Sequence, residues 1–226
     1  MLTDAHKATR MGAALMFLER YERDGNTFLD QIVTGDETWI SHNTPTSKRR
    51  SMEWHHAQSP KRPRKFKQTA SARKLMASVF CDGQGVLLVD FMARNTTINV
   101  DAYCTTRQRL RQAMQNRRRG KLSHDIALIH DNARSHTARQ TQTLLHDAFH
   151  CDTFDHPPYS PGLAPSDFYL FSKMKKHLAG KRFTDYEDLQ HAVMDWLKFG
   201  HLDDYQYGGD YTRGSNANSE TTTVYD

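Results

Sequence analysis

The sequence predicts a single mixed α/β domain with helices packed on a mixed sheet. Two observations carry this prediction: three strand-like segments follow one another early in the chain, and strands and helices alternate after them. With 226 residues, the chain can bury one substantial core. We expect a linker helix within residues 1–27, the main domain over residues 28–199, and a disordered tail, poor in apolar residues, over residues 200–226.

The first half of the chain predicts one helix and three strands. Ala8, Met11, Leu15 and Leu18 recur at helical spacing, which predicts a helix over residues 3–23. Apolar, β-prone segments follow, and the sequence DGQG between the second and the third favours a hairpin turn. The three expected strands cover residues 28–40, 75–81 and 86–92. Such consecutive strands are expected to pair antiparallel.

The second half predicts alternating helices and short strands. Helices are expected from Asn99 to the arginines at 117–119, over 138–148, from Asp167 with Ser166 as its cap, and over 186–197; strands are expected at 126–129 and 153–154. The later strands must join the sheet by crossover connections. Three antiparallel strands followed by crossover strands are the element order of an RNase H-like fold.

Composition favours an intracellular protein with a polyanionic partner. Lys and Arg number 31 against 26 Asp and Glu, and the pI is about 9.1, so nucleic acid is a suitable partner. Cys81, Cys104 and Cys151 are odd in number and form no Cys-x-x-Cys pair, which is typical of a reducing compartment and argues against structural zinc. No apolar run reaches the roughly 18 residues of a membrane span. We therefore expect a soluble protein with no membrane partner.

Two basic segments are candidates for nucleic-acid contact. The stretch 59–74 contains two prolines and is too polar for a core, so we expect a projecting loop that contacts DNA or a partner chain. Its basic residues are Lys61, Arg62, Arg64, Lys65, Lys67 and Arg73. The run Arg117, Arg118 and Arg119 is either a solvated helix end or a phosphate contact, with equal weight.

Three aspartates are candidate metal ligands. Asp36 lies within or at the end of an early strand, Asp131 follows a central strand, and Asp167 begins a helix. Neighbouring strands are about 4.8 Å apart, so carboxylates on them can share an ion, and hard oxygen ligands suit Mg²⁺ or Mn²⁺. Taken singly, each aspartate is more often a solvated turn or capping residue.

Their neighbours have less certain roles. His130 and His136 flank Asp131 and could be metal ligands, although a hydrogen-bonding structural histidine is the more ordinary interpretation, and His130 is also a candidate partner of Asp131. Asn132 could orient Asp131 or a scissile phosphate, and capping of the following helix is an equally weighted alternative. Glu37 should point to the opposite face of the strand from Asp36, so it is not counted as a ligand.

Three motifs around the aspartates carry a family resemblance. VTGDETWI at 33–40, HDNARSH at 130–136 and YSPGLAPSDF at 159–168 resemble, in order, the three active-site blocks of mariner transposases. FMARNTTI at 91–98 and KKHLAGKRF at 175–183 are similar to the same family. The resemblance covers residues 1–199, and three long motifs in the right order are far more specific than one short pattern.

The resemblance implies a metal-dependent DNA transposase domain that acts in the nucleus. Such a domain cleaves phosphodiester bonds at transposon ends and joins the 3′-hydroxyls to target DNA. Asp36, Asp131 and Asp167 match the family's metal-binding aspartates, which hold two Mg²⁺ or Mn²⁺ ions. The loop 59–74 matches the segment that reaches across to the second subunit of a homodimer.

The sequence departs from the family pattern at several points. Between Asp131 and Asp167 lie 35 residues, one more than is usual, with the extra residue near 146–153, and Gly162 replaces a usual aspartate. The family's upstream helix-turn-helix region is not in this chain, so specific recognition of transposon ends is not expected. An alternative is therefore a decayed or domesticated relic that binds DNA or dimerises without catalysis. Mariner domains also occur fused to SET-domain histone methyltransferases, but no methyltransferase cofactor site is recognisable here.

Overall fold

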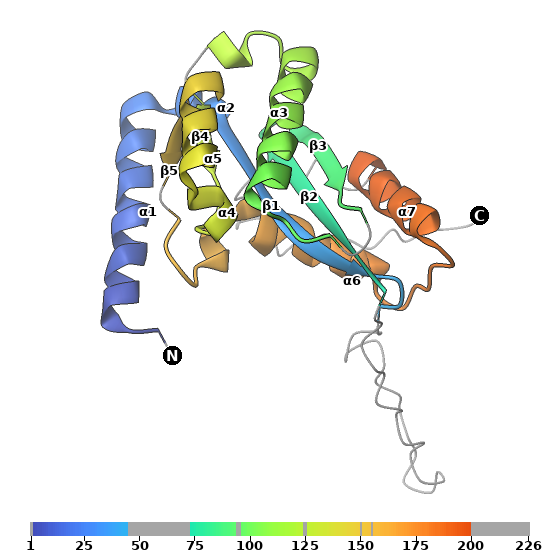
Figure 1. The fold of residues 1–226 in the computed structure, drawn as a ribbon. Coiled ribbons are helices and arrows are strands. Elements are labelled where there is room, and N and C mark those ends of the chain that lie inside the picture. Colours follow the sequence, from blue (N-terminus) through green and yellow to red (C-terminus); the bar gives the residue numbers. More distant parts are fainter. Residues whose placement is uncertain are drawn as a thin grey trace, which may run out of the picture.

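The computed structural model describes residues 2–44, 73–93, 96–123, 126–149, 151–154 and 156–199 (Figure 1). The helices are α1 (Asp4–Asp24), α2 (Asn26–Gln31), α3 (Val100–Arg117), α4 (Arg134–Thr137), α5 (Arg139–Leu144), α6 (Ser172–Leu178) and α7 (Tyr186–Phe199). Short 3-10 turns are η1 (Lys121–Ser123) and η3 (Pro161–Leu163), and π-helical turns are η2 (Leu145–Phe149) and η4 (Ser166–Phe171). The strands are β1 (Ile32–Ser41), β2 (Lys74–Asp82), β3 (Gly85–Phe91), β4 (Ile126–Ile129) and β5 (Cys151–Phe154).

The five strands form one mixed sheet in the order β3-β2-β1-β4-β5. β1, β2 and β3 pair antiparallel, whereas β4 joins β1 in parallel and β5 joins β4 in parallel. This is the predicted RNase H-like order of three antiparallel strands followed by crossover strands. The long β1 therefore lies at the centre, between the antiparallel and the parallel parts.

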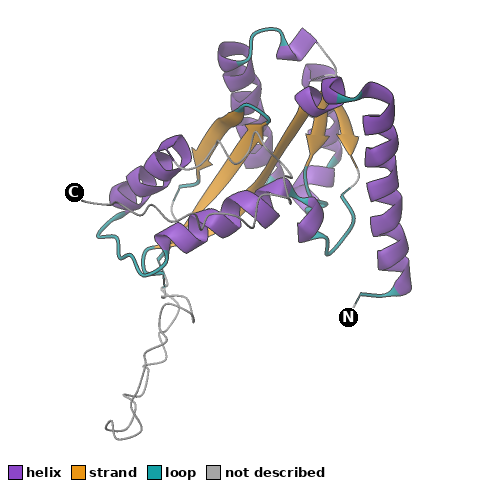
Figure 2. Cartoon of the chain, turned by 180° about the vertical axis from the view of Figure 1, so that it is seen from behind, coloured by secondary structure: helices purple, strands orange, loops and turns teal. Residues whose placement is uncertain are grey.

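Helices cover both faces of the sheet. On one face, α3 and the segment after α5 bury a cluster around Val33, Phe80 and Leu110. On the other, η4, α6 and α7 bury a cluster around Val79, Phe171 and Leu189, and Figure 2 shows these helices from behind. Alternate residues of β1 thus serve opposite layers, since Val33 belongs to the first cluster and Ile40 to the second.

Most predicted elements are confirmed, but two local predictions are wrong. Residues 28–31 are helical rather than extended, because Phe28 is fully buried in α2, with its ring 4.9 Å from that of Phe17 and 5.4 Å from that of Phe154. Ser166 does not cap a helix: η4 begins at Ser166 itself, after Pro165, with no side-chain cap. The predicted helix over 138–148 is divided into α5 and the π-helical η2.

The π-helical turn η2 lies where the sequence has its extra residue. A π turn closes its hydrogen bonds over one residue more than an α turn. The extra residue was assigned to 146–153, and η2 spans Leu145–Phe149. A π turn at this position accounts for how the insertion can be absorbed before β5 begins.

Several predictions concern residues outside the described ranges. The tail 200–226 and, within the loop 59–74, Lys61, Arg62, Arg64, Lys65 and Lys67 lie there. Within the described residues, no helix is both long and apolar enough to cross a membrane. Cys81 and Cys104 are buried free thiols, as expected.

Candidate active site

Strand register brings Asp36 and Asp131 to the same end of the sheet. Thr34 of β1 pairs with Ile129 of β4 in parallel, and the same register continued along both strands sets Asp36 opposite Asp131. Asp167 lies in η4, which packs against β1. The fold therefore gathers the three predicted aspartates where β1 and β4 diverge.

Asp36 is an acid in unfavourable surroundings. Burial, together with the negative charges of Glu37, Asp131 and Asp167, raises its pKa to about 7, against the lowering effect of a 2.7 Å hydrogen bond from the Glu37 backbone N–H. That backbone bond is its only hydrogen bond within the described residues. Asp131 and Asp167 are therefore near enough to Asp36 to influence its pKa, although no hydrogen bond joins the three carboxylates within the described residues.

Asp131 is held by His136. The His136 Nδ1 lies 2.6 Å from the Asp131 Oδ1, which also accepts a 3.0 Å hydrogen bond from the Ala133 N–H. On its other side, the ring has its Nε2 3.3 Å from the Glu37 Oε2, an ion-pair contact. Burial disfavours the charged imidazolium, but the interactions with Asp131 and Glu37 outweigh it and raise the pKa of His136 to about 9. The His136 interaction lowers the pKa of Asp131.

His130 and Asn132 do not contact the Asp131 carboxylate. Burial, together with the charges of Arg107 and His136, lowers the pKa of His130 to about 3, so it is neutral at pH 7. The Asn132 side-chain amide donates to the His156 carbonyl at 2.5 Å, so it ties the end of β4 to the segment after β5 rather than capping a helix. The histidine that contacts the Asp131 carboxylate is His136.

The site fits a divalent cation in its chemistry. Carboxylate oxygens are the ligands that Mg²⁺ and Mn²⁺ prefer, and Mg²⁺ usually keeps several waters. The hydroxyls of Thr34, on the Asp36 face of β1, and Ser166, next to Asp167, are buried without a hydrogen-bond partner and could bind such waters. Within the described ranges, no three His, Cys, Asp or Glu side chains are close enough, as they stand, to hold one ion.

The arginines at 117–119, predicted to contact nucleic acid, lie away from the three candidate metal ligands. Arg118 and Lys121 bind the buried Asp82 at 3.0 and 2.9 Å, near the start of β1. Arg117 donates to the Leu87 carbonyl at 3.1 Å, while Arg119 is exposed. All four line an open pocket of about 560 Å³ at that end of the sheet.

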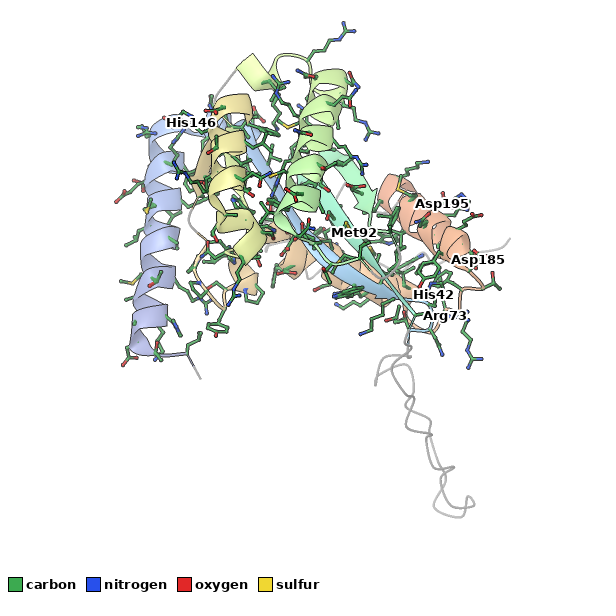
Figure 3. The ribbon with its side chains drawn as sticks, viewed as in Figure 1. His42, Arg73, Met92, His146, Asp185 and Asp195 are labelled. Atoms are coloured by element: carbon green, nitrogen blue, oxygen red, sulfur yellow. The ribbon has the colours of Figure 1, made fainter. Side chains whose placement is uncertain are left out.

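Arg73, the described member of the loop cluster, lies at the opposite end of β1. Its carbonyl accepts the His42 N–H at 3.2 Å, and Figure 3 shows both beside Asp185. β2 therefore begins at this end of the β1–β2 pair.

Comparison with known proteins shows the family. Residues 44–124 match the family described as transposase (partial DDE domain). The chain is 34% identical to the Mariner Mos1 transposase of Drosophila mauritiana over 199 residues, which are 87% of this chain and 55% of Mos1. It superposes on the Mos1 catalytic domain with a TM-score of 0.73 at 29% identity, covering 91% of this chain and 87% of that one. The chain belongs with the catalytic domains of mariner transposases.

Two further relatives agree with this mariner assignment. The Mos1 mariner paired end complex with Mn gives a TM-score of 0.79 at 31% identity, covering 91% of this chain and 59% of that one. The human histone-lysine N-methyltransferase SETMAR is 29% identical over 214 residues, which are 92% of this chain and 29% of SETMAR. The chain thus spans about half the length of Mos1 and less than a third of SETMAR.

Reasoning from sequence missed two residues of this mariner site. Glu37 does point away from Asp36, as predicted, but from that face it reaches His136 and so connects to Asp131. The sequence spacing could have indicated this contact, because His136 comes one helical turn after the Asp131–Ala133 turn and its ring can fold back over the aspartate. The sequence marked His136 only as one of two histidines that flank Asp131, and its contact with the carboxylate depends on packing against Tyr103, whose ring lies 4.0 Å from that of His136.

Proposed function

We propose that this chain is a metal-dependent DNA transposase catalytic domain that cleaves phosphodiester bonds at transposon ends and joins 3′-hydroxyls to target DNA. Asp36, Asp131 and Asp167 are the proposed ligands of two Mg²⁺ or Mn²⁺ ions. The observation that carries the proposal is Asp36: a half-buried carboxylate, amid three other acids, whose pKa is raised to about 7. Perturbed acids of this kind are typical of functional sites.

The proposed chemistry needs no covalent nucleophile from the protein. Two divalent ions about 3.5 to 4 Å apart activate a water or a 3′-hydroxyl and stabilise the leaving oxygen of an in-line displacement. Asp36 must lose its proton to act as a ligand, and Asp131 and Asp167 must close toward it. The positions of Asp36 and Asp131 favour this closure because each follows the last paired residues of β1 and β4, Thr34 and Ile129, by two residues.

The solved relatives support metal and DNA as partners. Mos1 structures are described as a paired end complex with Mn, a paired end complex with Mg, and a strand transfer complex. We extend divalent-metal and DNA binding to this chain on that likeness. A homodimer through the loop 59–74 and a nuclear location belong to the same proposal.

A second candidate is a relic that binds DNA or dimerises without catalysis. One observation favours it: in the described ranges no three potential ligands are close enough to share an ion. Gly162, which is exposed in η3 where the family has an aspartate, is a further departure.

Plasmid nicking separates the two candidates. The chain should nick supercoiled DNA with Mg²⁺ or Mn²⁺, and Asp36→Ala or Asp131→Ala should abolish nicking. Asp195→Ala is the matched control, since Asp195 is exposed on α7 (Figure 3). Salt-sensitive DNA binding without nicking in any variant would establish the relic instead.

A further inference from the structure

We propose that His136 is a positioning residue that fixes one oxygen of Asp131 and so presents the other to a divalent ion. The inference rests on the proposed function, because it assumes that Asp131 is a metal ligand. Histidine was weighed above only as a structural residue or a direct ligand. The contacts favour a third role, in which the ring acts through a carboxylate.

The described contacts of the Asp131 carboxylate fall on one of its oxygens, while the His136 Nδ1 also lies 3.2 Å from the Asp131 backbone carbonyl oxygen. His136 Nδ1 lies 2.6 Å and Ala133 N 3.0 Å from Oδ1, within the part of the chain that the structure describes. Hydrogen bonds to one oxygen of a carboxylate restrict its rotation and leave the second oxygen available as a metal ligand. The grip comes from α4 and the turn before it, so it is built into the segment that follows β4.

The ring of His136 is itself fixed from three sides. It is 1% exposed, it stacks on Tyr103 with an angle of 26° between the rings, and its Nε2 lies 3.3 Å from the Glu37 Oε2. Glu37 is in turn held by the Ser78 hydroxyl, which donates to Oε1 at 3.3 Å. A mobile side chain could not define the position of Asp131, whereas one held in this way can.

The same contacts connect two of the proposed ligands. Glu37 follows Asp36 directly in β1, and its backbone N–H donates to the Asp36 carboxylate. A chain of contacts therefore runs from Asp36 through Glu37 and His136 to Asp131. Partners of ligating side chains commonly orient the ligand, and their loss costs about 10- to 100-fold in metal affinity.

Isosteric replacements test which ring nitrogen matters. His136→Asn keeps a donor near the position of Nδ1, whereas His136→Gln keeps one near Nε2, and His136→Leu keeps neither. We expect Mn²⁺ affinity, measured from the EPR signal of free Mn²⁺, to fall about 10- to 100-fold in the Gln and Leu variants. The Asn variant should bind close to the wild-type affinity.

Controls separate positioning from folding. His42→Asn removes another buried imidazole, which meets the ring of Tyr186 edge to face beyond the far end of β1, and should leave Mn²⁺ affinity unchanged. Should His136→Leu unfold, the Asn and Gln pair decides, because both keep a polar side chain. The unfolding midpoint of every variant is measured alongside.

Two results would overturn the inference. Equal Mn²⁺ affinity in the Asn and Gln variants, with both folded, would show that His136 only fills space. Wild-type binding in Asp131→Asn, or no binding by the wild-type chain, would overturn the proposed function together with this inference. Binding lost in Asp131→Asn but kept in all His136 variants would overturn this inference alone.

Discussion

Asp82, which is buried, and Asp36, which is half-buried, are carboxylates on neighbouring strands, and their surroundings differ. Asp82, at the end of β2, lies 3.0 Å from Arg118 and 2.9 Å from Lys121. Asp36, in the middle of β1, has only a backbone N–H and three acidic neighbours. Burial raises the pKa of both, but the two cations bring the pKa of Asp82 below its ordinary value, whereas that of Asp36 rises to about 7.

The difference indicates at which end of the sheet the negative charge requires a bound cation to balance it. At the Asp82 end, the chain supplies its own cations, so the charge is balanced within the fold. At the Asp36 end, the cationic side chain that pairs with carboxylates in the described structure is His136, which contacts Asp131 and Glu37. A divalent cation would balance the remaining charge.

The largest expected difference is in the free energy of unfolding when each of these two carboxylates is neutralised. Asp82→Asn should destabilise the fold by about 3 kcal/mol, because it leaves two partly buried cations without their anion. Asp36→Asn should leave the free energy of unfolding unchanged or raise it, since it relieves repulsion. Urea unfolding of both variants at pH 7.5 measures the difference, and equal losses would break the comparison.

The pH dependence of stability should separate the two carboxylates next. The folded-state pKa of Asp36 is raised, so its contribution is full near pH 4 and is lost as the pH rises toward 7. The folded-state pKa of Asp82 is lowered, so its contribution is present above about pH 4 and is lost as the pH falls below it. Unfolding curves between pH 4 and 8 should decline less steeply for Asp36→Asn than for the wild type. Parallel curves would contradict the raised pKa.

A smaller effect is expected from substitutions of Arg118 and Arg119, which should alter different properties of the protein. Arg119 is exposed and forms no ion pair in the described structure, so Arg119→Gln should weaken DNA binding and reduce the salt slope by about 1. Arg118→Gln should instead lower stability, because Arg118 holds Asp82. Fluorescence anisotropy with a DNA duplex at several salt concentrations measures the slope. An unchanged slope would make Arg119 a solvated helix end.

The smallest expected change in the free energy of unfolding comes from introducing a carboxylate at the exposed position 162. A side chain at Gly162 would meet no atom within 4 Å. Gly162→Asp should therefore change the free energy of unfolding by no more than about 0.5 kcal/mol. Thermal unfolding tests this, and a larger loss would show that an acid here needs a partner as Asp82 does.

Periodic segments could be predicted from the sequence, and contacts between distant segments could not. Repeating apolar positions revealed α1, α3 and α7, and the DGQG turn revealed the β2–β3 hairpin. The helix α2 was not predicted, because it depends on the packing of Phe28 against Phe154, which is distant in the sequence. Likewise, the sequence showed the three aspartates but not the grip of His136 on Asp131, since the start of α4 decides where that ring points.

The most direct test of the central claim is Mn²⁺ binding by isothermal titration at pH 7.5. The wild-type chain should bind, and Asp36→Asn and Asp167→Ala should each lose that binding while remaining folded. Equal binding by the wild type and both variants, or none by any, would contradict the claim that the acidic end of the sheet is a divalent-metal site.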